Sequence, residues 1–315
     1  MWKKDYHELM YSKDIQKINP TEAFMLKYSK IPPSLFKFRA INEFSIDNLK
    51  NDTAWFSKAT EFNDPYDSGL TINKEMVHYK KIKADFLKAF SVKFNVEFEE
   101  IAKICSCLSL DDSITVLMKT LDASDSQAES IRKEVDRIKN GTSDIYDKFI
   151  SDISLEYQQR IFVSCFSEKD DSMLMWSHYA RNHTGMCIEY DFAALDFKNK
   201  LVWDLHPVKY IYDLLDINEY SEEVRKKMSI LTLAAISKSL EWEYEKEWRI
   251  ILFEDKHNES FNSKLVTPKS IILGSRISVE DKELIVDIAK SKNIPLKQVQ
   301  LDRTKYGLLV NELLI

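Results

Sequence analysis

Residues 161 to 191 read IFVSCFSEKDDSMLMWSHYARNHTGMCIEYD, and the architecture of the chain follows from this segment. It contains two short apolar runs, Ile161 to Phe166 and Met186 to Ile188. An acidic turn and a helical segment with Trp176 and Tyr179 lie between them. Short apolar runs bounded by turn residues are typical of buried strands. The segment therefore predicts strand, helix, strand, and its density of polar and aromatic residues predicts a site.

Two other segments are equally dense in polar and aromatic side chains. Residues 35 to 69 contain LFKFRAIN and WFSKATEFNDPYDSG, and residues 241 to 253 read EWEYEKEWRIILF. We expect residues 36 to 67, 164 to 189 and 243 to 249 to converge around one cleft, because catalytic partners act within contact range. Further strands are predicted at Leu35 to Phe38, Thr53 to Ser57, Val208 to Tyr212, Trp248 to Phe253, Ser270 to Leu273, Lys297 to Leu301 and Leu308 to Leu313, and helices at Glu222 to Leu240 and Val279 to Lys292.

These elements predict an α+β fold with a mixed or antiparallel twisted central sheet and a large helical insertion. Residues 74 to 159 have helical periodicity almost throughout and form the predicted insertion. Residues 1 to 32 are a helical or irregular lead-in, because the prolines at 32 and 33 stop any helix. With 315 residues and 44% hydrophobic content the chain can bury a large core, so a single domain over residues 1 to 315 is expected.

The order of motifs resembles a known family. FKFR, FNDPYD, SCFSE followed by MWSHYA and HTGMCIEYD, EYEKEWRII and IILGSR are similar to the bacterial domain-of-unknown-function family 2971. The resemblance extends from about residue 33 to the end of the chain. It implies no established activity, so function is inferred from the residues themselves.

Composition disfavours several common classes of protein. Only five glycines occur, and the Rossmann, P-loop and nucleophile-elbow motifs, which all need glycine, are absent. A net charge of −6 argues against a broad nucleic-acid surface. The sequence contains no apolar run long enough to span a bilayer and no signal-peptide pattern, and its four cysteines form no CxxC pair. We expect a cytoplasmic protein with no membrane partner and no metal; the sequence does not indicate the oligomeric state.

Glu245 and Glu247 are the candidate catalytic residues. If EWEYEKEWRI is extended, Glu243, Glu245, Glu247 and Arg249 all project from one face. Adjacent carboxylates raise one another's proton affinity, which suits acid–base catalysis. The alternative is a structural sheet face on which Arg249 and nearby lysines neutralise the acids.

Five residues are candidates for binding a cofactor. Arg39 follows a predicted strand, where its guanidinium can bind a phosphate with two hydrogen bonds. Ser164 and Ser167 lie near the end of a strand, where a hydroxyl can orient a ligand or serve only in a turn. Trp176 and Tyr179 offer rings that can stack on a base or a nicotinamide, or can belong to the core.

The order arginine, serine, Glu-x-Glu also resembles that of ADP-ribosyltransferases. The resemblance implies an enzyme that uses NAD, in which Arg39 holds the pyrophosphate, Trp176 or Tyr179 stacks on the nicotinamide, and Glu247 stabilises the ribose cation. It also suggests a toxin or phage-defence effector, and the acceptor, protein or nucleic acid, is not indicated. Two departures exist: the serine segment is SCFS rather than Ser-Thr-Ser, and a helical block of about 85 residues separates it from the arginine.

Two other functions remain open on the sequence. In a metal-dependent nuclease, Asp64, Asp67 and Glu245 or Glu247 would bind Mg²⁺. In a non-catalytic ligand sensor or interaction scaffold, the same segments would form a pocket or a partner surface. Dependence on divalent cations would indicate the nuclease, and consumption of NAD would indicate the transferase.

Overall fold

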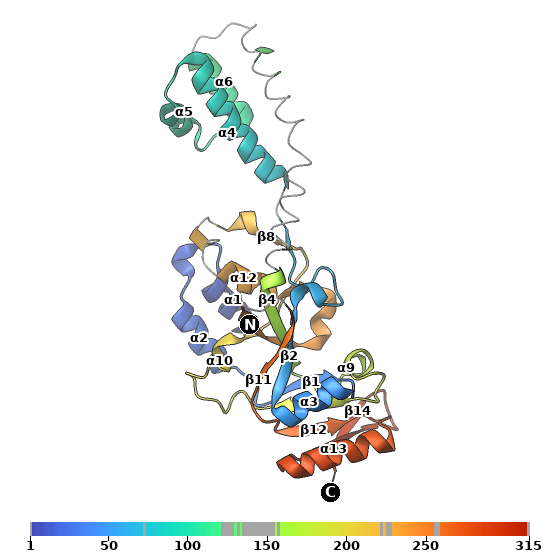
Figure 1. The fold of residues 1–315 in the computed structure, drawn as a ribbon. Coiled ribbons are helices and arrows are strands. Elements are labelled where there is room, and N and C mark those ends of the chain that lie inside the picture. The colour runs from blue at the N-terminus through green and yellow to red at the C-terminus, as the bar shows by residue number, and fades with distance from the viewer. Residues whose placement is uncertain are drawn as a thin grey trace. The chain divides into compact units, whose positions relative to one another are not determined.

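The computed structural model describes residues 2–71, 74–120, 129–130, 133, 155, 158–220, 223–224, 229–254 and 259–313. The chain forms two compact units. One unit, here called the sheet unit, comprises Met1–Leu70, Leu155–Leu215 and Tyr220–Ile315; the other, the helical unit, comprises Thr71–Ser154 and Asp216–Glu219. The predicted α+β class is confirmed, because the sheet unit combines helices with one large sheet (Figure 1).

The large sheet is mixed and mostly antiparallel. Among the described strands of this sheet, only β12 and β13 pair in parallel, and α13 (Val279–Lys292) connects them. The strand order is β11 (Phe261–Lys264), β2 (Thr53–Lys58), β4 (Ile161–Ser167), β1 (Leu35–Arg39), β5 (Met186–Tyr190), β12 (Ser270–Leu273), β13 (Leu296–Leu301) and β14 (Leu308–Glu312), and β10 (Glu247–Phe253) pairs with both β4 and β6 (Leu205–Pro207).

The sheet splits along one edge of β4. On its other edge β4 pairs with β10 over its whole length, from Glu247 opposite Ser167 to Phe253 opposite Ile161. On the split edge, β2 pairs only near the start of β4 and β1 pairs only at Ser167. Between these two contacts no described strand pairs with this edge of β4. Strands β1 and β2 therefore diverge and leave room for side chains.

The two faces of the sheet are packed differently. One face carries the largest hydrophobic cluster, which includes residues of α3 (Glu43–Asn51), α10 (Lys200–Asp204) and α13. On the opposite face one cluster lies against α1 (Trp2–Tyr11) and α12 (Ser229–Ile236), and another lies against α9 (Met173–Tyr179). Glu247 and Arg249 alternate with Trp248 and Ile250 along β10. Because they lie opposite Ser167 and Cys165, the two charged residues share this second face.

The remaining short elements complete the sheet unit. Strand β7 (Lys209–Ile211) pairs in parallel with β9 (Ser237–Ser239). The unit's other elements are α2 (Pro20–Tyr28) and the 3₁₀ turns η1 (Ile15–Lys17), η2 (Ala59–Glu61) and η4 (Leu240–Glu245). The chain passes between the two units at the two-residue strands β3 (Leu70–Thr71) and β8 (Leu215–Asp216), and the 3₁₀ turn η3 (Ile217–Glu219) belongs to the helical unit.

The helical unit has its own small core. Its described helices are α4 (Lys74–Phe94), α5 (Phe98–Cys105) and α6 (Leu110–Thr120). Phe86, Phe90, Ile101, Cys105 and Leu117 are among the buried residues that pack together. Of the predicted insertion 74–159, residues 121–128, 131–132, 134–154 and 156–157 lie outside the described part of the chain.

Two predicted elements differ from the structure. The chain is not extended through EWEYEKEWRI: it forms the turn η4, Lys246 adopts a left-handed conformation with φ 45°, and the strand begins only at Glu247. The predicted helix 222–240 is shorter where it is described, because α12 ends at Ile236 and β9 follows; residues 221–222 and 225–228 lie outside the described part.

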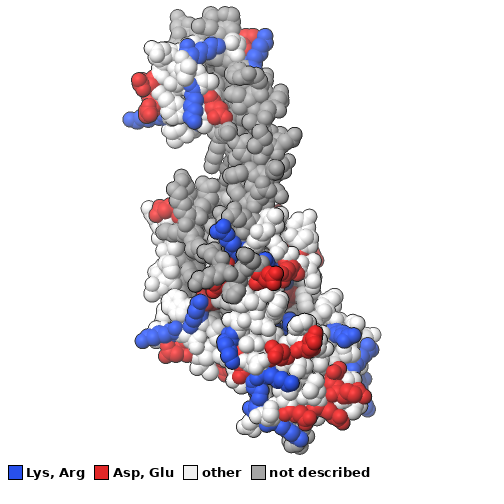
Figure 2. Space-filling view, in the orientation of Figure 1, with Lys and Arg blue, Asp and Glu red and all other residues white. Residues whose placement is uncertain are grey.

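On the face drawn in Figure 2, acidic and basic side chains are interspersed and form no wide surface of one sign. Within the residues that the structure describes, no helix is both long enough and apolar enough to cross a membrane.

Candidate functional site

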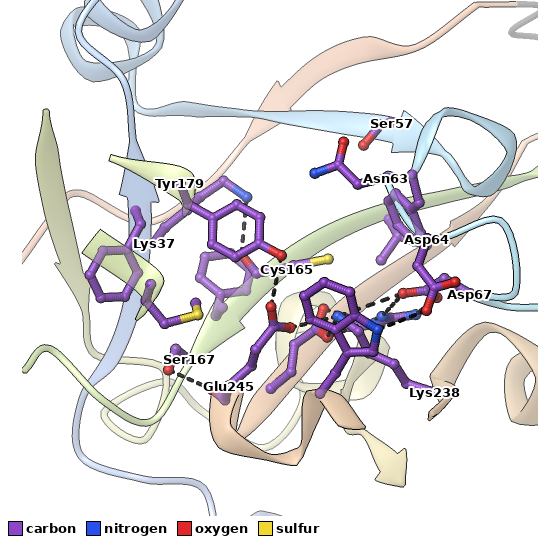
Figure 3. A pocket seen from close by; sticks show the side chains of 18 of the residues that line it. Lys37, Ser57, Asn63, Asp64, Asp67, Cys165, Ser167, Tyr179, Lys238 and Glu245 are labelled. Carbon is purple, nitrogen blue, oxygen red and sulfur yellow. Dashed lines mark hydrogen bonds and ion pairs between the residues drawn. The ribbon is translucent and has the colours of Figure 1, made fainter. Parts of the chain in front are cut away.

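A cavity of about 330 Å³ opens where β1 and β2 diverge from β4. Its walls come from the three segments that we expected to converge: β1 with the FNDPYD turn, β4 with α9, and η4 with β10 (Figure 3). Lys238 on β9 also lines it. The cavity therefore lies on the second face of the sheet, beside the charged residues of β10.

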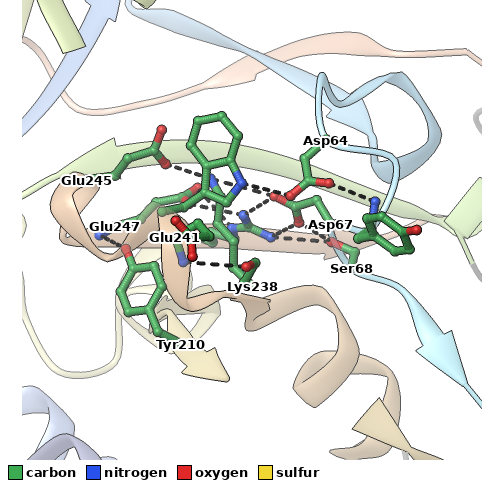
Figure 4. A network of polar contacts seen from close by, with 12 residues as sticks. Asp64, Asp67, Ser68, Tyr210, Lys238, Glu241, Glu245 and Glu247 are labelled. Carbon is green, nitrogen blue, oxygen red and sulfur yellow. Dashed lines mark hydrogen bonds and ion pairs between the residues drawn. The ribbon is translucent and has the colours of Figure 1, made fainter. Parts of the chain in front are cut away.

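One wall is a network of buried carboxylates around Lys238. The ammonium of Lys238 donates to Glu245 Oε2 at 2.5 Å and to Glu247 Oε2 at 2.9 Å, and lies 3.7 Å from Asp67 Oδ2 (Figure 4). All four side chains are less than 10% exposed. Such a network is stable only while each charge keeps its partner.

Arg249 is the second cation of the network, and its side chain is fully buried. Its guanidinium donates to both oxygens of Asp67, at 2.6 and 2.7 Å, and to both oxygens of Glu247, at 2.9 and 3.0 Å. The guanidinium carbon also lies 5.3 Å from the centre of the Phe62 ring. Three carboxylates and two cations leave this network with one negative charge when all five groups are ionised.

Local structure sets the positions of the two glutamates. The left-handed turn at Lys246 brings Glu245 beside Glu247, although the two side chains leave different elements. Ser167 donates its hydroxyl to the carbonyl of Glu245 at 2.6 Å, and the N–H of Glu247 donates to the Tyr210 hydroxyl at 2.8 Å. These bonds fix the backbone on both sides of the turn.

The two glutamates have opposite pKa shifts. Burial raises the pKa of Glu247, but the charges of Arg249 and Lys238 outweigh burial and hold this pKa well below its usual range. For Glu245 burial prevails over the attraction of Lys238, and its pKa is raised. Glu247 is therefore a fixed negative charge, whereas Glu245 is suited to accept a proton.

Two cations of β1, Lys37 and Arg39, also line the cavity, and neither forms an ion pair with a described carboxylate. Lys37 fills the split in the sheet, where its ammonium donates to Ser164 Oγ at 2.8 Å and to the carbonyl of Cys165 at 3.1 Å. Burial and the nearby Arg39 lower the pKa of Lys37 to about 8. Arg39 lines the cavity, no carboxylate in the described part of the chain pairs with it, and burial lowers its pKa. An anionic ligand would supply the missing partner.

Aromatic side chains complete the walls. The Tyr179 hydroxyl donates to Glu245 Oε1 at 2.7 Å, and burial together with the Glu245 charge raises its pKa (Figure 3). Trp242 donates its indole N–H to Asp64 Oδ2 at 2.8 Å, and the Lys238 ammonium lies 5.1 Å from its ring centre. Trp55 also lines the cavity.

The structure places five of the seven predicted site residues at the cavity: Arg39, Ser167, Tyr179, Glu245 and Glu247. Ser164 lies behind the wall, where it is buried and accepts from Lys37. Trp176 does not line the cavity. It is fully buried, packs edge-on against Phe38 and donates its indole N–H to the carbonyl of Asp170, so its ring is not available for stacking on a ligand.

Sequence reasoning missed two important cations. Lys37 lies inside the quoted FKFR motif, and its position two residues before Arg39 on one strand could have indicated a shared face. Lys238 stands alone after an apolar helix, in ISKS, and no local pattern distinguishes it. Only its pairing with residues of distant segments reveals its role.

The carboxylates are not arranged as free metal ligands. Both oxygens of Asp67 and of Glu247 accept from Arg249, and Lys238 lies among all three acids. Asp64 accepts from Trp242. Within the part of the chain that the structure describes, no cluster of three histidine, cysteine or acidic residues is placed to hold a metal ion.

Comparison with known proteins gives one match. Residues 175–250, which include most of α9, all of β5 and the Glu245–Glu247 turn, match the model of a family described as a protein of unknown function (DUF2971). This match supports the resemblance to the family that the motifs predicted, and it covers about a quarter of the chain. No curated protein and no solved structure matches the chain. The similarity to ADP-ribosyltransferases stays a prediction.

Proposed function

We propose that the cavity is the active site of an ADP-ribosyltransferase-like enzyme that cleaves NAD and transfers its ADP-ribose to an acceptor. The observation that carries the proposal is that cations and carboxylates line one cavity. Lys37 and Arg39, which form no ion pair with a described carboxylate, line it together with the Glu245–Glu247 pair.

This polarity fits the charges of NAD. The pyrophosphate is a dianion, and a guanidinium is well suited to bind it with two hydrogen bonds. At the other end of the molecule the nicotinamide riboside carries a positive charge, which matches the net negative charge of the carboxylate network. Tyr179 and Trp242 line the cavity at this end and can contact the nicotinamide ring.

Each group has a defined role in the reaction. The bond between ribose C1′ and the nicotinamide nitrogen breaks, and its electron pair leaves with nicotinamide, which becomes neutral. The positive charge remains on the ribose as an oxocarbenium ion, and the fixed charge of Glu247 stabilises it. The acceptor's nucleophilic atom then bonds to C1′ and releases its proton to Glu245, whose raised pKa suits a base.

Binding of NAD by wild type and by Arg39→Gln tests the proposal. Isothermal titration should show one site in the wild type and at least about a tenfold weaker site in the variant, because a charged hydrogen-bond pair to phosphate is lost. Arg303→Gln is the matched control, since Arg303 is exposed and does not line the cavity. Nicotinamide riboside lacks the pyrophosphate, so its affinity should not change in Arg39→Gln. Equal affinity of the wild type and Arg39→Gln for NAD would refute the assignment of Arg39.

A further inference from the structure

A second cavity of about 230 Å³ lies in the sheet unit and shares Lys238 with the first. Tyr66 and Gly69 line it from the end of the FNDPYDSG segment, whose Asp64 and Asp67 line the first cavity. This segment and Lys238 therefore contribute to both cavities. The other lining residues are Ile211, Tyr212, Asp213, Leu214, Ser237 and Ser239.

Two tyrosines expose their rings at this cavity. Tyr66 is 66% exposed and Tyr212 is 87% exposed. Neither ring packs against another aromatic ring in the described part of the chain. Large exposed aromatic side chains beside a cavity are typical of binding surfaces, because their rings lose little conformational entropy when they bind.

The charged residues that line the second cavity indicate which kind of ligand it can bind. Asp213 is exposed, and no described residue forms a hydrogen bond or an ion pair with its carboxylate. Lys238, the cation among the lining residues, is already bound by Glu245 and Glu247. The cavity thus offers aromatic faces and a free carboxylate but no free positive charge. A phosphate would lack a partner here, whereas a cation can contact both the rings and the carboxylate.

We infer that this second cavity is a subsite for the acceptor, in which a cationic side chain of a protein acceptor, guanidinium or ammonium, docks beside the site of NAD cleavage. The inference rests on the proposed function, because only a transferase needs an acceptor. The binding of the cation itself does not depend on that function. The shared Lys238 links the two cavities, so an acceptor held at Tyr212 and Asp213 lies close to the carboxylates that act on it.

Titration with model side chains tests the subsite. The probes are N-acetylarginine amide, N-acetyllysine amide and, as the neutral control, N-acetylglutamine amide. We expect one or both cations to bind the wild type with a dissociation constant on the order of millimolar, as for a fragment of this size, and the glutamine probe not to bind. The stronger of the two cations identifies the acceptor side chain.

Two exposed positions allow the test without loss of folding. Tyr212→Ala and Asp213→Asn should each weaken cation binding at least fivefold, because each removes one of the two contacts. Tyr306→Ala is the matched control, since Tyr306 is 99% exposed between β13 and β14 and does not line the cavity, and it should bind the probes as the wild type does.

Three results would overturn the subsite: no binding of either cation, equal binding in Tyr212→Ala and the wild type, or binding of adenosine monophosphate in place of the cations. Nicotinamide release by the wild type is measured separately. A protein that releases nicotinamide but binds no cation refutes the subsite alone, and one that binds the cation without cleaving NAD refutes the proposed function alone.

Discussion

Replacing Arg249 by methionine should destabilise the sheet unit strongly. Arg249 is fully buried and donates to both oxygens of Asp67 and of Glu247. In Arg249→Met, Glu247 keeps the Lys238 ammonium at 2.9 Å, but the nearest remaining cation to Asp67 is Lys238 at 3.7 Å. Removing one partner of a buried ion pair costs about 3–5 kcal/mol. We expect a loss in this range at pH 7, mostly from the uncompensated Asp67.

Urea unfolding followed by tryptophan fluorescence measures this loss. The six tryptophans all belong to the sheet unit, so the signal reports on that unit. Asp67→Asn in the Arg249→Met background should recover part of the loss, because it removes the buried charge that lost its partner. Arg303→Met, at an exposed position, should change stability by less than about 0.5 kcal/mol. A loss below about 1 kcal/mol in Arg249→Met would refute the view that this network is held by its charges.

Three further predictions concern the cavity. Burial lowers the pKa of Lys37 from 10.5 to about 8, so its charge destabilises the fold below pH 8 and this cost falls as the pH rises toward 10.5. In urea unfolding at pH 7, Lys37→Met should therefore be more stable than the wild type by about 1 kcal/mol, and this difference should disappear between pH 8 and 10.5. The variant should also bind NAD more weakly. A variant less stable than the wild type at pH 7 would contradict this reasoning. Tyr179→Phe removes a hydrogen bond that lowers the pKa of Glu245, so the acidic limb of the pH profile of nicotinamide release should move to higher pH. If this limb does not move, Glu245 is not the group that titrates. Treatment with EDTA should leave nicotinamide release unchanged, because the carboxylate oxygens already accept hydrogen bonds from Lys238 and Arg249, whereas loss of activity that Mg²⁺ restores would favour a metal-dependent enzyme.

The regular elements of the sheet unit could be predicted from the sequence because their patterns are local. Helix α13 has its predicted bounds, since Ser278 caps its start and Asn293, with φ 54°, ends it. Strand β12 also has its predicted bounds. The extended chain predicted through EWEYEKEWRI was wrong for a physical reason. The same alternation of charged and aromatic residues fits a 3₁₀ turn followed by a strand, and no residue type in the segment indicates the left-handed conformation of Lys246.

The site was harder to predict than the strands because its contacts are long-range. Arg39, Tyr179 and the two glutamates were found because each lies in a dense motif. Trp176 was misjudged because a sequence does not show which side of a short helix faces the core; the ring lies in the cluster beneath α9. The pairing of Lys238 with three acids depends on the position of β9, which was not predicted.

The proposed role of Glu247 in NAD cleavage is tested by nicotinamide release from the wild type, Glu247→Gln and Glu243→Gln. Glu243→Gln is the matched control, because Glu243 lies in the same segment but is exposed and pairs only with Lys246 among the described residues. Glu247→Gln should lose about 3–5 kcal/mol of stability, since Glu247 is buried against two cations, so release is measured at a temperature at which the variant is fully folded.

We expect the wild type and Glu243→Gln to release nicotinamide from NAD, and folded Glu247→Gln to do so at least about 10²-fold more slowly. Release by folded Glu247→Gln at the wild-type rate, or no binding and no cleavage of NAD by the wild type, would contradict this expectation.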